Sequence, residues 1–114
     1  MHELSVCQGL LRQVRQIVEE RGATAVERIV LQVGGLSGVE PPLLERAFEI
    51  AREGTVAGQA DLEIRTGPVV VRCLECGGHS AVSPNRLLCS YCGEWRVQVE
   101  EGEELLLLSV ELQL

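Results

Sequence analysis

Four cysteines form two Cys-x-x-Cys motifs whose sulfurs could hold a metal ion. Cys73 and Cys76 make the first motif, Cys89 and Cys92 make the second, and twelve residues separate the two. Four thiolates on two tight turns can meet at the corners of a tetrahedron, which is the geometry of a closed structural zinc site. The spacing therefore predicts one zinc ion (Zn2+) bound by all four sulfurs.

Glycines directly follow both motifs, at residues 77 and 93. A residue without a Cβ lets the backbone amides turn toward the sulfurs, which favours a metal-binding turn. The alternatives are two disulfides or a redox dithiol, but neither explains why two similar units lie so close together. A fifth cysteine, Cys7, is left over, and its position in an apolar stripe indicates a buried thiol.

The charge of the chain argues against a nucleic-acid partner. The formal net charge is -7 at pH 7, and four thiolates around one divalent ion make it more negative. Nucleic-acid binding needs a basic footprint and usually aromatic stacking platforms. The aromatic residues are Phe48, Tyr91 and Trp95 alone, and we expect Trp95 to pack against the zinc-binding segment.

The sequence also argues against an enzyme and against a membrane protein. It has two histidines and suggests no combination of nucleophile, base and orienting group. No apolar run approaches membrane-spanning length, and the first apolar stretch is interrupted by charged and polar residues, unlike a secretory signal. We therefore expect a cytoplasmic protein, in a reducing compartment that favours thiolate ligation.

The periodicity of apolar residues predicts two helices and three strands outside the cysteine segment. Residues 4–20 carry apolar side chains at helical spacing, with Gly22 as the C-terminal cap. Residues 26–33 form a β-branched run typical of a strand, and the prolines at 41 and 42 can open a second helix that Gly54 closes. Residues 61–65 and 105–112 predict two further strands, which would pair with the first.

These elements predict an α+β fold. A two-helix, three-stranded domain would comprise residues 1–69 and be completed by residues 100–114. A zinc-ribbon lobe with rubredoxin-like cysteine turns would be inserted at residues 70–99. No internal repeat or low-complexity segment is present.

The first three residues, Met-His-Glu, could bind a second metal ion. A terminal amine, the following backbone nitrogens and Nδ1 of His2 can enclose a divalent ion in fused chelate rings, and Glu3 can add an oxygen. Nitrogen-rich tetragonal sites of this kind suit nickel(II) or copper(II). The alternative is a frayed, solvated chain end, as at many termini.

Three motifs together resemble one family. Met-His-Glu-Leu-Ser opens the first predicted helix, Val-Gly-Gly-Leu-Ser-Gly-Val at residues 33–39 precedes the second, and the double Cys-x-x-Cys comes late in the chain. With Phe48-Glu49 and the closing Gly-Glu-Glu-Leu at residues 102–105, the chain resembles HypA/HybF, the nickel-incorporation proteins of [NiFe]-hydrogenase maturation. The likeness covers essentially the whole sequence.

The resemblance implies a metallochaperone that delivers nickel (Ni2+) for [NiFe]-hydrogenase. His2 and Glu3 would carry the nickel, and Cys73, Cys76, Cys89 and Cys92 would hold structural zinc. The implied partners are the GTPase HypB and the hydrogenase large-subunit precursor, and some relatives also serve urease.

Some alternatives stay open at this point. The chain could instead be a zinc-ribbon adaptor that binds protein and carries no second metal. The sequence leaves open whether the protein is a monomer or a homodimer, and which hydrogenase receives the nickel. It also leaves open whether Cys7 or His79 contributes to a metal site, although a closed set of four cysteines needs no histidine.

Overall fold

A computed structural model describes residues 3–114 of the chain. Its elements follow one another as α1 (Glu3–Arg21), β1 (Ala25–Gly34), α2 (Pro41–Ala51), β2 (Asp61–Gly67), β3 (Val69–Cys73), β4 (His79–Val82), β5 (Val97–Glu101) and β6 (Leu105–Gln113). The chain divides into two compact units. Unit 1 comprises the described part of Met1–Leu31 with Val39–Arg65 and Leu106–Leu114, and unit 2 comprises Gln32–Gly38 and Thr66–Leu105.

Helix α1 has one buried face, as the sequence predicts. Its buried side chains recur every three or four residues: Cys7, Leu10, Leu11, Val14 and Val18. The helix ends at Arg21, and Gly22 follows with a φ of 65°, a left-handed conformation that glycine adopts without steric cost. The predicted cap is therefore confirmed.

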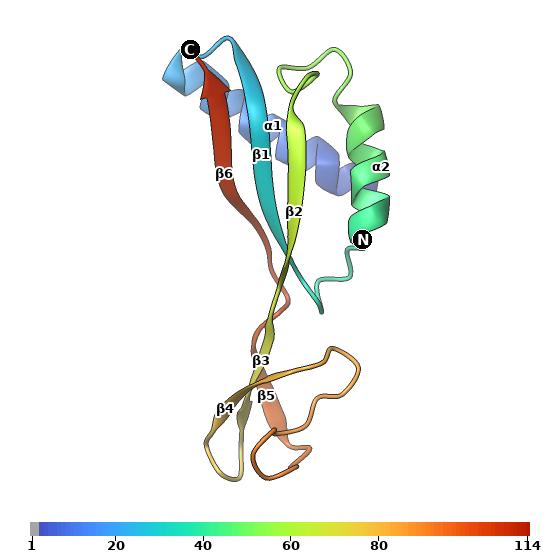
Figure 1. Cartoon of the computed structure of the whole chain (residues 1–114), viewed down its shortest axis with the longest axis vertical. Coiled ribbons are helices and arrows are strands. Elements are labelled where there is room, and N and C mark those ends of the chain that lie inside the picture. The colour runs from blue at the N-terminus through green and yellow to red at the C-terminus, as the bar shows by residue number, and fades with distance from the viewer. Residues whose placement is uncertain (1–2) are drawn as a thin grey trace. The chain divides into compact units, whose positions relative to one another are not determined.

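Helix α2 connects two parallel strands of a three-stranded sheet in the order β2-β1-β6. Its first two residues are Pro41 and Pro42, which fit a first helical turn because their missing amide hydrogens would have no partner there. Arg28 forms an ion pair with Glu63, and four residues later Gln32 contacts Gly67, so β1 and β2 run in the same direction. Strand β6 runs the opposite way along the other side of β1 (Figure 1).

Both helices lie on one face of this sheet, and α1 crosses behind the strands (Figure 1). The largest fully buried side chains of unit 1 come from all the layers: Val14 of α1, Ile29 and Leu31 of β1, and Leu44 and Phe48 of α2. These residues make a continuous apolar core, which is the main source of stability for a domain of this size. The expected two-helix, three-stranded α+β architecture is confirmed.

Unit 2 contains a second three-stranded sheet in the order β4-β3-β5. Both neighbours of β3 are antiparallel to it, with Arg72 opposite His79 on one side and opposite Gln98 on the other. The sheet carries the cysteines: Cys73 ends β3, and the loop between β4 and β5 holds Cys89 and Cys92.

Residues 32–38 pack into unit 2 through close backbone contacts. The Gly34 amide donates to the carbonyl of Glu104, and the Leu36 amide donates to the carbonyl of Gly102. A Cβ on Gly34 would lie 2.2 Å from the Gly102 oxygen, so this approach requires glycine. The Val-Gly-Gly motif noted in the sequence therefore has a structural role in unit 2.

The cysteine lobe lies between β2 and β6 in the sequence, as expected for an insertion. The division into a domain of residues 1–69, completed by residues 100–114, and a domain of residues 70–99 stays a prediction. Among the described residues, no helix is both long and apolar enough to cross a membrane.

Candidate metal centre

The two Cys-x-x-Cys motifs fold into turns with the same hydrogen-bond pattern. In the first cysteine turn (residues 73–78), the Cys73 amide donates to the carbonyl of Gly78 and the Gly77 amide donates to the carbonyl of Cys73. In the second cysteine turn (residues 89–94), the same two bonds recur sixteen residues later. Gly77 and Gly93 have φ values of 73° and 77°, so each turn needs its glycine.

The four sulfurs converge to the spacing of a tetrahedral zinc site. The Cys73 and Cys92 sulfurs lie 3.6 Å apart, the Cys76 and Cys89 sulfurs lie 3.7 Å apart, and all four lie within 4.8 Å of one another. A tetrahedron with zinc–sulfur bonds of about 2.3 Å has sulfur–sulfur edges of about 3.8 Å. The donor set and its spacing therefore fit zinc.

Backbone amides favour thiolate at one cysteine of each turn. The amides of Cys76 and Glu75 both donate to the Cys73 sulfur at 3.3 Å, and the Cys76 bond makes the largest contribution to lowering the Cys73 pKa. In the second turn, the Cys92 amide is the main cause that lowers the Cys89 pKa to about 6. Both shifts favour the thiolate, which is the form that a cation requires of its cysteine ligands.

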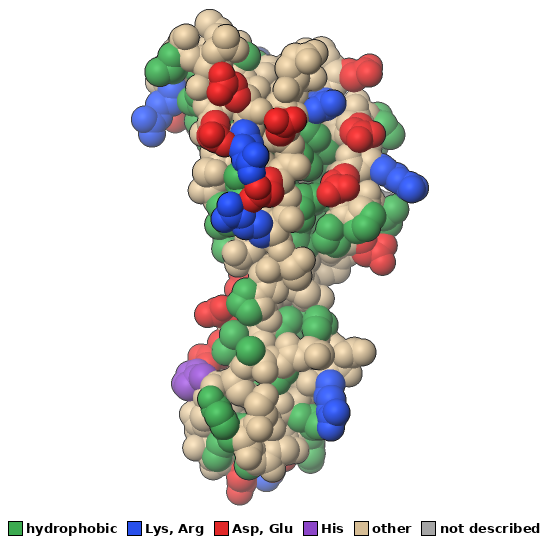
Figure 2. Space-filling view, in the orientation of Figure 1, with side chains coloured by type: hydrophobic (Ala, Val, Ile, Leu, Met, Phe, Trp, Pro, Cys, Tyr) green, Lys and Arg blue, Asp and Glu red, His purple; other side chains and the backbone are tan. Residues whose placement is uncertain are grey.

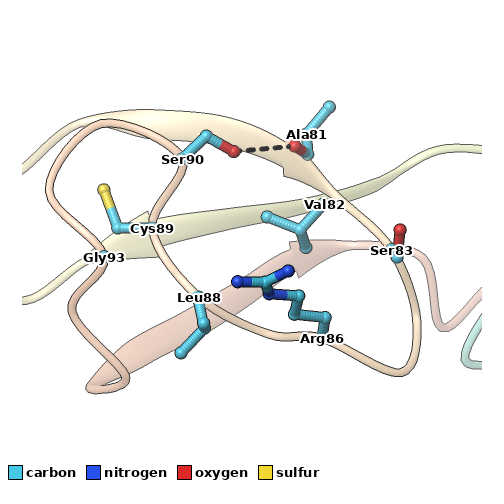
Figure 3. Close-up of a pocket in the computed structure, with 8 residues that line it drawn as sticks. All are labelled: Ala81, Val82, Ser83, Arg86, Leu88, Cys89, Ser90 and Gly93. Carbon is cyan, nitrogen blue, oxygen red and sulfur yellow. Dashed lines mark hydrogen bonds between the residues drawn. The ribbon is translucent and has the colours of Figure 1, made fainter.

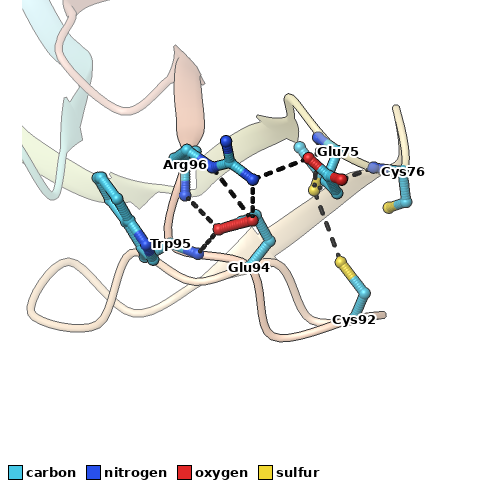
Figure 4. Close-up of polar contacts among 7 residues, drawn as sticks. Glu75, Cys76, Cys92, Glu94, Trp95 and Arg96 are labelled. Carbon is cyan, nitrogen blue, oxygen red and sulfur yellow. Dashed lines mark hydrogen bonds and ion pairs between the residues drawn. The ribbon is translucent and has the colours of Figure 1, made fainter.

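Arg96 follows the second cysteine turn and joins Glu75 of the first turn to Glu94 at the end of the second (Figure 4). Its guanidinium donates to Glu75 at 2.9 Å and to Glu94 at 2.8 Å. The Glu94 carboxylate also accepts the amides of Trp95 and Arg96, at 2.9 and 3.2 Å. Hydrogen bonds from Arg96 lower the Glu94 pKa to about 2, so the carboxylate keeps its charge across neutral and mildly acidic pH.

Replacing Arg96 with glutamine should loosen the pairing of the two cysteine turns. Mutation of residues that hold metal ligands in position, without binding the metal themselves, typically lowers metal affinity about 10- to 100-fold. We therefore expect zinc release to a competing chelator to become about tenfold faster in Arg96→Gln. The measurement is the absorbance of a zinc-responsive dye after mixing with zinc-loaded protein.

Arg72→Gln is the matched control for this experiment. Arg72 lies in the same unit and carries the same charge, but its guanidinium donates to Gln98, away from both glutamates. Equal acceleration in both variants would mean that charge alone retains the zinc and that the bridge has no separate effect.

Two hydrogen bonds join strand β4 to Ser90 of the second cysteine turn. The buried Ser80 hydroxyl accepts the amide of Ser90 at 3.1 Å, and the Ser90 hydroxyl donates to the carbonyl of Ala81 at 3.1 Å (Figure 3). In Figure 3, Ser90 and Ala81 line a hollow of about 420 Å3, together with Val82, Ser83, Arg86, Leu88, Cys89 and Gly93. No sequence pattern indicates this support, since serine is common in loops.

The predicted second metal site lies mostly outside the described residues. His2 is not described, and Glu3 is the first residue of α1. The Glu3 carboxylate accepts the amide of Glu40, just before α2, at 3.3 Å. The side chain of Glu3, a predicted nickel ligand, therefore holds the start of α1 against the residue before α2.

Cys7 is a core thiol and lies in unit 1, apart from the four-sulfur cluster. It is fully buried and donates to the carbonyl of Leu44 at 3.6 Å. Burial, and next the charge of Glu3, raise its pKa to about 11. The expectation of a buried Cys7 is confirmed.

Cys7 should resist alkylation in the folded protein. Because its raised pKa keeps the thiol protonated at pH 8, we expect iodoacetamide to modify it only after denaturation. Mass spectrometry of zinc-loaded protein, with and without urea, measures this. Rapid labelling without urea would show that the α1–α2 interface opens readily.

His79 begins β4, and its ring pairs with Glu100 of β5. Its Nδ1 is therefore engaged by a carboxylate, and the four cysteines form a cluster without it. The structure thus places His79 on the sheet beside the first cysteine turn.

One expectation about the cysteine segment was wrong. Trp95 does not pack into the ribbon, because 73% of its surface is exposed. The residue lies between Glu94 and Arg96, whose side chains bond each other and fix the backbone there. The local ion pairs leave the indole outside.

The fold and the cysteine site define the class of this protein: an α+β protein with an inserted zinc-ribbon lobe built to hold a metal ion on four thiols. A family model described as "Hydrogenase/urease nickel incorporation, metallochaperone, hypA" matches residues 1–112. The chain belongs to this HypA family of nickel metallochaperones of hydrogenase maturation.

Individual relatives agree over their full lengths. The hydrogenase maturation factor HypA of Nitrosospira multiformis is 48% identical over 112 residues, which are 98% of this chain and 97% of the relative. HypA of Aquifex aeolicus is 39% identical over 113 residues, 99% and 98% of the two chains. The solution structure of the nickel metallochaperone HypA from Helicobacter pylori matches with a TM-score of 0.73 at 30% identity, covering 99% of this chain and 98% of that one.

Proposed function

We propose that this chain binds nickel(II) through His2 and Glu3 and delivers it for maturation of [NiFe]-hydrogenase, while zinc on Cys73, Cys76, Cys89 and Cys92 holds unit 2 folded. The observation that supports this most directly is the match to the nickel-incorporation family over residues 1–112, which includes both proposed nickel ligands and all four cysteines. The protein would act by metal transfer and not by catalysis.

The position of Glu3 supports exchange of the metal with another protein. The residue starts α1, and helix ends open with far less free energy than a packed core. Little structure therefore has to unfold for nickel to enter or leave. The cysteine site has the opposite character, because four anionic ligands in one closed shell release their metal slowly.

The proposed partners are the GTPase HypB and the hydrogenase large-subunit precursor. The sequence has no phosphate-binding loop, since the glycines at 34 and 35 lack the lysine and helix of that motif. Gly34 instead lies against the backbone of Gly102, and Gly35 lies against the side chains of Pro84 and Val69. Any nucleotide-driven step would then come from HypB, in the cytoplasm.

The test is a calorimetric nickel titration of zinc-loaded protein that begins at Met1 without a tag. We expect stoichiometric nickel binding in the wild type and its loss in His2→Ala, with zinc content unchanged in both. His79→Ala is the matched control, because it removes the other histidine and should bind nickel normally. Equal binding by the wild type and His2→Ala would contradict the proposed nickel site.

The alternative, a zinc-ribbon adaptor without a second metal, makes the opposite prediction. It requires no nickel binding by any variant and no effect of His2→Ala on any partner. The same titration therefore separates the two functions.

A further inference from the structure

The exposed tryptophan next to the cysteine site is held in a rigid backbone. Trp95 is the only tryptophan of the chain, and 73% of its surface is exposed. The Glu94 carboxylate accepts the Trp95 amide, and the next residue, Arg96, is bonded to Glu94 and Glu75. In Figure 4 the indole extends away from these polar contacts. A backbone that hydrogen bonds already hold has less entropy to lose on binding.

A second apolar side chain is anchored to the same segment. The Leu74 amide donates to the carbonyl of Arg96 at 3.0 Å, and 56% of the Leu74 surface is exposed. The first cysteine turn and the residues after the second therefore both present apolar groups to solvent. Scattered exposed apolar residues are ordinary, but a large aromatic in a fixed position is typical of protein interaction sites.

The charge around Trp95 indicates what kind of surface it fits. Two carboxylates, Glu75 and Glu94, share the single guanidinium of Arg96, which leaves a net negative charge. Four thiolates around one zinc ion would add to it. In unit 2 as a whole, six glutamates stand against three arginines. The partner surface that complements Trp95 and its acidic surroundings would therefore have an apolar pocket with basic residues around it.

We propose that Trp95 is the docking anchor of unit 2 and inserts into an apolar pocket with a basic rim on a partner protein. This inference rests on the proposed function, because it takes the partner to be one of the two maturation proteins named there. Trp is among the residues that dominate binding energy at interfaces, and removing it should cost far more than removing its neighbours. A nucleic acid is disfavoured as the occupant, because the same negative charge repels phosphate.

The test uses the single tryptophan as a probe. Growth with 5-fluorotryptophan labels Trp95 alone, so one 19F NMR signal reports its environment even in a complex with proteins that contain other tryptophans. HypB and the large-subunit precursor are each added to the labelled, zinc-loaded chain. We expect one of them to shift and broaden the signal and to protect it from a soluble paramagnetic quencher.

Variants then measure the energetic role of the side chain. In calorimetry with the protein that shifts the signal, we expect Trp95→Ala to weaken binding about 30-fold or more. Trp95→Phe should recover part of the loss, since it restores an aromatic ring. Ile50→Ala is the matched control, because Ile50 of α2 is also 73% exposed and large, and it should bind as the wild type does.

The outcomes distinguish the inference from the proposed function. Binding with an unshifted 19F signal, or equal affinity of Trp95→Ala and the wild type, would overturn the inference and leave the function intact. Failure of both proteins to bind the wild type would overturn the proposed partners and the inference together. A shift produced equally by single-stranded RNA would replace the protein partner with a nucleic acid.

Discussion

Cys73→Ser is expected to lose zinc and to unfold unit 2 while unit 1 stays folded. The buried side chains of unit 2 are few, and two of them belong to the four-cysteine cluster: Val33, Val69, Val71, Cys73, Ser80 and Cys89. Structural zinc contributes about 10 kcal/mol of apparent binding free energy in small zinc domains. A core this small cannot replace that contribution. A zinc assay measures the loss of metal, and two-dimensional 15N NMR shows which unit unfolds.

Cys7→Ser is the matched control for this change. It makes the same chemical substitution at the fifth cysteine, where serine can still donate to the carbonyl of Leu44. We expect full zinc content and an intact unit 2 in this variant. A folded, zinc-free Cys73→Ser protein would show that unit 2 does not depend on the metal.

Gly34→Ala is expected to destabilise unit 2 by about 3 kcal/mol or more, the upper range for overpacked positions. The new methyl group would lie 2.2 Å from the Gly102 oxygen and 2.4 Å from its carbonyl carbon. Both are backbone atoms, so no side chain can rotate away. Relief of the clash would stretch the hydrogen bond from Gly34 to Glu104. Urea unfolding followed by NMR resolves the two units, which a single spectroscopic signal would merge.

Gly9→Ala is the matched control, because the same substitution at this position is expected to stabilise the protein. Gly9 lies inside α1, and the nearest atom to its added methyl would be the flexible end of Arg12 at 3.6 Å. Alanine in a helix interior is favoured over glycine by about 1 kcal/mol, so this variant should be more stable. If Gly34→Ala unfolds within 1 kcal/mol of the wild type, the close approach of residues 34 and 102 is not a constraint.

The sequence was sufficient to predict both helices, the strands β1, β2 and β6, and the cysteine cluster, because these depend on local patterns. The stripe containing Cys7, Leu10 and Val14 has helical spacing whatever packs against it. The two Cys-x-x-Cys turns have the same local chemistry at two places in the chain. The prolines at 41 and 42 marked the start of α2 within one residue.

The features that escaped prediction depend on contacts between distant residues. Nothing local indicates that Gly34 meets Gly102, or that residues 32–38 belong with the cysteine lobe. The exposure of Trp95 follows from the choice of partners for Arg96, which pairs with Glu75 and Glu94. Apolar character alone predicted burial there, and the ion pairs decided otherwise.

The burial of Cys7 separates soft and hard metal ligands within one chain. Its sulfur lies one helical turn after Glu3, so a free thiolate there would add a soft donor beside the proposed nickel ligands. The core instead keeps that thiol protonated and bonded to Leu44. The Cys7 sulfur is then withheld from the proposed nickel ligands, and the other four cysteine sulfurs lie together in unit 2. Zinc and nickel would thus be sorted by donor type, without competing for one site.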